Sequence, residues 1–225
     1  MFYKNILLVV PIWFYGWFSI FSGTQIYNFQ LYSAYNVIFT SVPIIWFTTW
    51  DKEYHRDVLL RRPRLYRIGL ENVYFNKWVF WRWFFYATWQ GILLVSAIYF
   101  TLTFDSPSFD GHTASMQAAG ALVLTSIVIV VNIKLFISSF EITKWLVFLI
   151  LLSILAYFAS LWFLTWWSAE ADDFGVWYEL LTFAETYSIL IFFMFSYVLV
   201  DSGMRYASME INMILERRKE RAEYE

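Results

Sequence analysis

Residues 2–22 read FYKNILLVVPIWFYGWFSIFS, and residues 31–50 read LYSAYNVIFTSVPIIWFTTW. As helices rising about 1.5 Å per residue, both are long enough to cross the ~30 Å hydrocarbon core of a bilayer. Each nevertheless carries polar side chains, namely Lys4 and Asn5 in the first stretch and Asn36 in the second. A cation at mid-bilayer costs about 2.5–3.5 kcal/mol, so such residues usually face a protein interior or a substrate path. The two stretches therefore predict neighbouring membrane helices with a translocation site between them.

The second stretch also has a pattern of its own. Asn36, Thr40 and Pro43 follow an i, i+4, i+7 spacing, which predicts that all three share one face of a regular helix. Pro43 has no N–H group, so the carbonyl of Phe39 loses its usual helical donor at a depth where lipid offers none. We therefore expect a local break in this helix beside the polar residues.

The composition is that of a membrane protein. Hydrophobic residues make up 60% of the 225 residues and aromatic residues 24%, which is typical of chains that cross a bilayer. The 13 Trp and 16 Tyr residues fit the interfacial belts of such proteins. The chain has no cysteine, so disulfides and thiolate metal sites are excluded. A net charge of −2 gives no basic field for nucleic acid, and no nucleic-acid partner is expected.

The chain is expected to be all-α and polytopic, with six transmembrane helices. The predicted spans are residues 2–22, 31–50, 79–104, 117–139, 145–167 and 178–200. The segment 51–77 holds seven of the sixteen Lys and Arg residues and the tail five more, whereas 23–30, 105–116 and 168–177 hold none. The positive-inside rule then places both termini in the cytosol. The expected organisation is a six-helix domain over 1–203, with a cytosolic basic loop at 51–77, followed by a basic cytosolic tail over 204–225.

Several spaced motifs resemble one family. FYKN at 2–5, FSG at 21–23 before Tyr27, and YNVIFTSVP at 35–43 look like the fifth and sixth membrane helices of P-type phospholipid-flippase ATPases. PRLYRIGLENVYFN at 63–76 resembles that family's loop between helices six and seven, and VNIKL at 131–135 its eighth helix. The resemblance covers essentially the whole chain, in the family's order, as helices five to ten.

The resemblance implies a function for the polar residues. Lys4 and Asn5 match the Lys-Asn pair of the family's fifth helix, and Asn36 matches the asparagine of its sixth. In the family these positions line the path of a phospholipid headgroup from the outer or luminal leaflet to the cytosolic one. An amine and two amides can hydrogen-bond a phosphate or carboxylate as its water is removed. We therefore expect a headgroup path that includes Lys4, Asn5, Asn36, Thr40 and Ser41, with the acyl chains left in the bilayer.

The chain also lacks parts that the family has. P-type pumps need a D-K-T-G phosphorylation motif, a nucleotide-binding domain and an actuator domain, whereas the one Asp-Lys pair here, Asp51-Lys52, is followed by Glu53. The family's fourth helix is also missing. The sequence therefore predicts no cofactor in this chain and no ATP hydrolysis by it alone, with ATP and Mg²⁺ bound by the intact pump. The expected partners are phospholipid, the membrane, the remainder of the pump (helices one to four and the cytosolic domains) and a small two-span accessory subunit. The family resides in eukaryotic endomembranes or the plasma membrane.

Other interpretations stay open from the residues. Lys4 can extend to the cytosolic headgroups, and Asn36 can serve as an interhelical hydrogen bond. For Asn132 and Lys134, packing and snorkelling are favoured over function. The rival functions are an ATP-independent transporter or channel, and a non-catalytic membrane assembly module derived from a pump.

Overall fold

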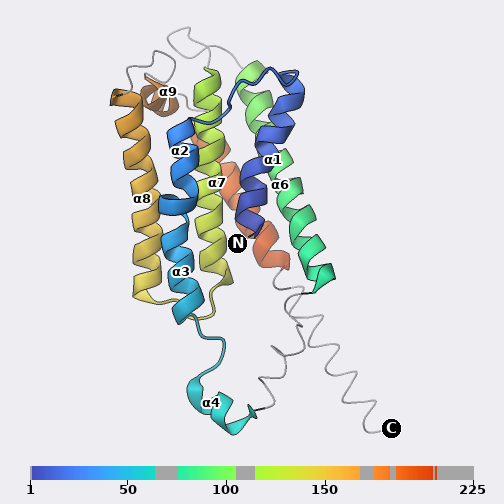
Figure 1. The fold of residues 1–225 in the computed structure, drawn as a ribbon, viewed down its shortest axis with the longest axis vertical. Coiled ribbons are helices and arrows are strands. Elements are labelled where there is room, and N and C mark those ends of the chain that lie inside the picture. Colours follow the sequence, from blue (N-terminus) through green and yellow to red (C-terminus); the bar gives the residue numbers. More distant parts are fainter. Residues whose placement is uncertain are drawn as a thin grey trace.

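The computed structural model describes residues 2–63, 76–104, 115–167, 175–182, 186–204 and 206. Within these residues the protein is all-helical, and its long helices lie side by side in one bundle (Figure 1). The helices are α1 (Phe2–Phe18), α2 (Phe29–Ala34), the π-helix η1 (Tyr35–Phe39), α3 (Ser41–Trp50), α4 (Arg56–Arg61), α6 (Lys77–Phe104), α7 (Met116–Ser138), α8 (Lys144–Trp167), α9 (Val176–Thr182) and a last helix, Thr186–Met204.

Four helices in the described part are long and apolar enough to cross a membrane. They are Lys77–Phe100 within α6, α7, α8 and Thr186–Met204. α1 has 17 residues, and the rod formed by α2, η1 and α3 is interrupted by its π-helical turn. The all-helical prediction is thus confirmed together with four of the expected spans. Six spans and the direction of the termini stay predictions.

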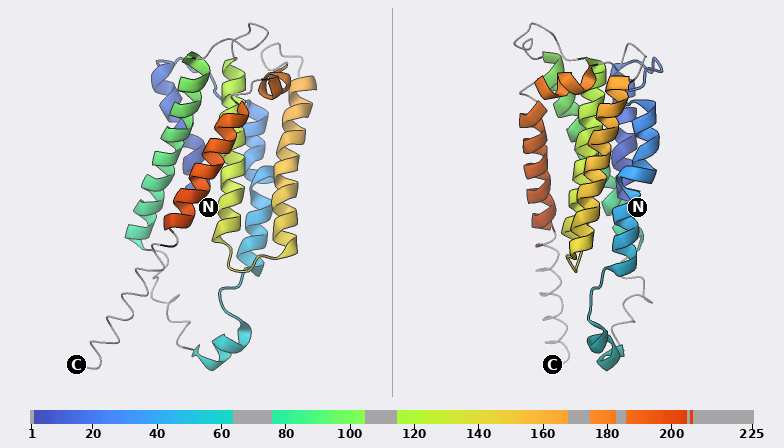
Figure 2. Two further views of the ribbon diagram at one scale, coloured as in Figure 1. Left: turned by 180° about the vertical axis from the view of Figure 1, so that it is seen from behind. Right: turned by 90° about the vertical axis from the view of Figure 1, so that its left-hand side faces the viewer.

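Two predicted boundaries are wrong. The first span was expected to reach residue 22, but α1 ends at Phe18, and Ile20 and Phe21 take φ angles of 51° and 52° in a left-handed turn. The sixth was expected to start at residue 178, but this segment forms the separate helix α9, which lies across one end of the bundle (Figure 2). The Glu179 carboxylate accepts hydrogen bonds from the amide and the hydroxyl of Ser115, just before α7. These bonds tie α9 to α7, and among the described residues the spanning helix covers Thr186–Met204.

α7 forms the centre of the bundle. It packs against α1, α3, α6, α8 and α9, and most of its side chains are buried, whereas only a minority of the side chains of α6, α8 and Thr186–Met204 are buried. Its first turn is capped by Ser115, whose hydroxyl accepts from the Ala118 amide at 3.1 Å. One turn later, the chain between α1 and α2 passes so close that a Cβ on Gly120 would lie 1.6 Å from the Ile26 carbonyl oxygen. Only a glycine permits this approach.

The opposite end of the bundle is held by Asp51, directly after α3. Its carboxylate accepts from the amides of Phe140, at 3.0 Å, and Glu141, at 2.9 Å, in the short turn between α7 and α8. Beyond this point the chain leads to α4, which lies outside the bundle at the same end (Figure 1). The predicted basic loop 51–77 is thus described except for residues 64–75, whereas the predicted tail 204–225 lies outside the described residues apart from Met204 and Tyr206.

We expect Gly120→Ala to destabilise the protein by about 1–3 kcal/mol, because the new methyl group must displace backbone rather than a flexible side chain. The measurement is the apparent melting temperature in detergent. Gly203→Ala is the matched control, since nothing lies within 4 Å of the position of its Cβ. Equal melting temperatures for the two variants would contradict the close approach.

Candidate functional site

Lys4 is buried in the first turn of α1, a helix that begins midway along the bundle (Figure 1). The residue as a whole is 5% exposed, and Leu7 and Leu8 on the same helical face are also buried. The Lys4 amine donates to the Thr40 hydroxyl at 2.8 Å and lies 5.8 Å from the centre of the Tyr35 ring. Among the described residues no carboxylate lies within ion-pair distance of it. Lys4 is thus bonded within the bundle rather than extended away from it.

Thr40 faces Lys4 because the helix changes pitch just before it. Residues Tyr35–Phe39 form a π-helical turn, and Thr40 leaves the helical region with a φ of −137°. The Thr40 hydroxyl, which accepts from Lys4, donates to the Tyr35 carbonyl at 2.8 Å. The Tyr35 hydroxyl in turn donates to the Lys4 carbonyl at 3.1 Å. Lys4 thus donates one hydrogen bond to Thr40 and accepts another from Tyr35, and these two bonds join the first turn of α1 to the π-helical turn and the residue after it.

The expected loss of a donor at the Phe39 carbonyl is confirmed, and other helices replace it. The carbonyl oxygen accepts from the Asn132 side-chain amide of α7 at 3.3 Å and from the Ser153 hydroxyl of α8. All of these groups are buried. In hydrocarbon, an unsatisfied carbonyl would cost several kcal/mol. The break in the rod is therefore fixed in place by α7 and α8, and the favoured packing role of Asn132 is confirmed.

The prediction that Asn36, Thr40 and Pro43 share a face is wrong. Thr40 and Pro43 are buried, whereas Asn36 is exposed. The π-helical turn adds about one residue per turn, so the neighbours across it are five residues apart. Tyr35 accordingly pairs with Thr40, and the carbonyl of Asn36 accepts from the hydroxyl of Ser41.

The other expected site residues lie nearer the surface of the bundle. Asn5 and Asn36 are exposed, and Ser41 is half-buried. Within the described part of the chain, neither asparagine side chain makes a hydrogen bond, so the interhelical bond considered for Asn36 is not found there. The structure thus brings Lys4 and Thr40 into direct contact. The side-chain amides of Asn5 and Asn36, which are close to these residues in sequence, lie on the surface.

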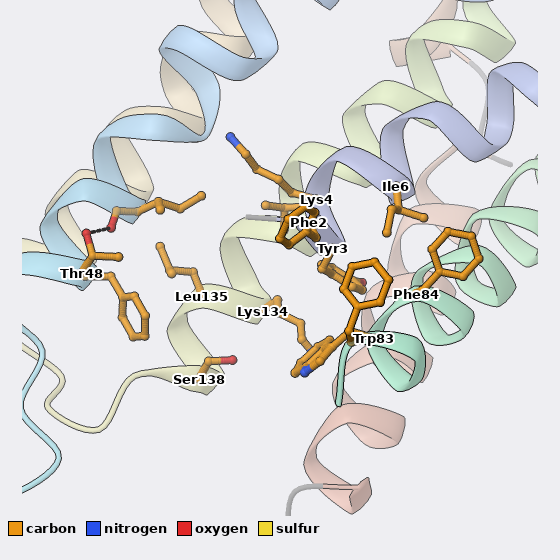
Figure 3. A pocket seen from close by; sticks show the side chains of 14 residues that line it. Phe2, Tyr3, Lys4, Ile6, Thr48, Trp83, Phe84, Lys134, Leu135 and Ser138 are labelled. Atoms are coloured by element: carbon orange, nitrogen blue, oxygen red, sulfur yellow. Dashed lines mark hydrogen bonds between the residues drawn. The ribbon is translucent and has the colours of Figure 1, made fainter. Parts of the chain in front are cut away.

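A cavity of about 360 Å³ borders Lys4 between α1, α3, α6 and α7. Its polar lining comes from Lys4, Thr48, Lys134 and Ser138, and the rest is apolar. Figure 3 shows Lys4 extending toward the rod that contains α3, whereas Tyr3 and Lys134 lie toward Trp83. The cavity is thus mostly apolar, with the Lys4 amine at its edge. No group of metal-binding side chains occurs among the described residues.

Sequence reasoning missed the second buried lysine. Lys134 on α7 was expected to snorkel, but it is 8% exposed and forms an ion pair with Asp201 of the last helix, which is 6% exposed. The signal was present in the sequence, because Asp201 directly follows an apolar run and falls on the cytosolic side expected for Lys134. Its position just past the predicted span made it look like an ordinary surface residue.

Comparison with known proteins gives a consistent result. A family model described as phospholipid-translocating P-type ATPase C-terminal matches residues 1–213. The chain is 34% identical over 140 residues to phospholipid-transporting ATPase 6 of Arabidopsis thaliana, covering 60% of this chain and 11% of that protein. It is 28% identical over 206 residues to phospholipid-transporting ATPase 10 of the same plant, covering 88% and 17%. It is 31% identical over 164 residues to human phospholipid-transporting ATPase ID, covering 71% and 13%. The chain thus spans less than a fifth of the length of these relatives.

We expect Thr40→Val to destabilise the protein by about 1–3 kcal/mol, because the Lys4 amine and the Tyr35 carbonyl both lose a buried partner. Thermal unfolding in detergent measures the change. Thr49→Val is the control, since Thr49 is exposed and bonds only within its own helix, to the Ile45 carbonyl. Thr40→Ser keeps the hydroxyl and should restore most of the stability. Equal loss in the Val and Ser variants would argue against these hydrogen bonds.

Proposed function

Since the chain belongs to the phospholipid-translocating P-type ATPase family, as its C-terminal part, we propose that it forms the six-span membrane region of an ATP-driven phospholipid translocase. The intact pump would move phospholipid from the outer or luminal leaflet to the cytosolic leaflet. The observation that carries this proposal is the buried Lys4 amine, held by a hydroxyl rather than by a carboxylate of the described residues. Such a cation is suited to receive an anionic guest.

The six spans of the proposal are the four long apolar helices, the rod of residues 29–50, and a span to which α1 belongs. That rod is about 30 Å long at the helical rise, long enough to cross the hydrocarbon core. α4 carries Arg56 and Arg61 and lies at the same end as the turn between α7 and α8. Positive charge marks the cytosolic side, which supports cytosolic termini.

In the proposed path, an ammonium and two amides replace the water around a lipid headgroup. The Lys4 ammonium has three donors, one of which goes to Thr40, and the others can meet a phosphate or carboxylate oxygen. The exposed side chains of Asn5 and Asn36 and the half-buried Ser41 would extend the polar surface along α1 and the rod. The acyl chains would stay in the bilayer beside the exposed apolar faces of these helices.

The remainder of the pump completes the proposal. The relatives are several times longer than this chain, and we propose that helices one to four and the cytosolic domains supply ATP and Mg²⁺ binding and phosphorylation. We further propose a small two-span accessory subunit as a partner. In this arrangement the described helices bind and guide the lipid, and the energy of ATP hydrolysis reaches them from the other domains.

The central experiment replaces Lys4 in the intact pump. Lys4→Met keeps the bulk and removes the charge, so we expect the apparent lipid affinity in lipid-stimulated ATP hydrolysis to fall about tenfold or more. A hydrogen bond to a charged group contributes roughly 1.5–3 kcal/mol, and about 1.4 kcal/mol corresponds to tenfold. Lys144→Met, on an exposed lysine at the start of α8, is the control. Unchanged lipid affinity and turnover in Lys4→Met would refute the role of the amine.

Asn36→Ala tests the surface part of the path. We expect an apparent lipid affinity a few-fold weaker, because a neutral hydrogen bond contributes about 0.5–1.5 kcal/mol. The melting temperature should not change, because the side chain is exposed and makes no hydrogen bond within the described residues. Measuring both quantities on one preparation separates binding from folding. A loss of stability with full lipid affinity would remove Asn36 from the path.

A further inference from the structure

Lys134 and Asp201 form a buried ion pair between α7 and the last helix. Their side chains are 10% and 7% exposed, and the Lys134 amine contacts a carboxylate oxygen of Asp201 directly. The Tyr86 hydroxyl of α6 donates to the same oxygen at 3.2 Å. Burying two charges is expensive unless they are paired and further hydrogen-bonded. Three helices therefore converge on this carboxylate.

Aromatic rings enclose the lysine of this pair. The Lys134 amine lies 4.4 Å from the centre of the Trp83 ring, 4.8 Å from Tyr86, 5.2 Å from Tyr3 and 5.9 Å from Tyr197. A cation over an aromatic face is attracted to it, most strongly where water is excluded. One of these rings, Tyr3, belongs to α1 and directly precedes Lys4.

Tyr3 is held on several sides by the same group of residues. Its hydroxyl bonds to the Gln90 side chain of α6 and pairs with the Tyr197 hydroxyl of the last helix at 2.7 Å. Its ring stacks on Tyr86 with 5.9 Å between centres and meets Trp83 edge to face at 5.8 Å. The position of Tyr3 is thus determined by α6, α7 and the last helix together.

Adjacent residues of a helix point about 100° apart, so Tyr3 and Lys4 leave α1 toward different neighbours. Figure 3 shows this divergence, with Lys4 directed toward the rod containing α3 and Tyr3 toward Trp83. Resting on the proposed function, we infer that the Lys134–Asp201 pair is a positioning device that fixes the rotation and height of the first turn of α1 through Tyr3. It thereby sets where the Lys4 amine meets the lipid headgroup. Lys134 and Asp201 themselves do not touch the lipid.

The test in the intact pump is a double-substitution cycle. Asp201→Asn should weaken the apparent lipid affinity several-fold, and Asp201→Glu, which keeps the carboxylate beside Lys134, should retain more of it. In the Lys4→Met background, Asp201→Asn should weaken the affinity no further, because its effect acts through Lys4. Glu179→Gln makes the same chemical change at the other end of α7 and should leave lipid affinity unchanged. Independent, multiplying effects of Lys4→Met and Asp201→Asn would overturn the inference, as would a lower melting temperature with normal affinity.

A spectroscopic measurement separates this inference from the proposed function. The chain has no cysteine, so Asn5→Cys places a spin label in the first turn of α1 once any other cysteines of the pump are replaced. We expect the label to become more mobile in Asp201→Asn and in the milder Tyr3→Phe, which keeps the ring and loses the hydroxyl. Glu179→Gln should leave it unchanged. Unchanged mobility in both test variants would overturn the positioning role, whereas an inert Lys4→Met with increased label mobility would overturn only the lipid role of Lys4.

Discussion

The hydrogen bond between the Lys4 amine and the Thr40 hydroxyl is the constraint on which the rest of the bundle depends. An ammonium at this depth needs a partner, and Thr40 reaches it only because the helix opens into a π-turn over Tyr35–Phe39. Just beyond that opening, Pro43 leaves the Phe39 carbonyl without its helical donor, and α7 and α8 supply one through Asn132 and Ser153. One buried charge and one proline thus account for a change of helical pitch and for polar side chains on two further helices.

The long apolar segments were predictable because the thickness of the bilayer fixes the length of a helix that crosses it. The resemblance of FYKN and YNVIFTSVP to the family's helices also led us to expect Lys4 and Thr40 near each other, and the two are in contact. The direction in which Asn36 points was predicted wrongly, because we assumed a regular helix. The π-turn places Tyr35, rather than Asn36, beside Thr40. α9 was not predicted as a separate helix, because its sequence is mostly apolar and resembles the start of a transmembrane helix. Its direction depends on the contact of Glu179 with Ser115, which the sequence does not reveal.

The partnership of Lys134 with Asp201 shows why side-chain pairing between distant helices escapes single-sequence reasoning. The two residues are 67 positions apart, and each taken alone resembles an interfacial charge. Only the packing of the last helix against α7 brings them together, and the same packing gathers Trp83, Tyr86 and Tyr197 around the amine. Lys4 and Lys134 therefore represent two uses of a buried cation, one held by a neutral hydroxyl and the other neutralised within the bundle.

The π-turn has a consequence for how this rod can change over time. A π-turn is equivalent to a regular helix with one residue inserted, so losing a single residue between Tyr35 and Phe39 would restore ordinary pitch. The part of the rod that precedes the π-turn, α2, would then rotate by about 100° relative to α3, the angle that one helical residue subtends. Tyr35 would leave the Lys4 carbonyl, and the neighbouring asparagine would turn to a different side. Length in this short segment is therefore constrained as tightly as residue identity, and natural variants should tolerate substitutions here far better than deletions.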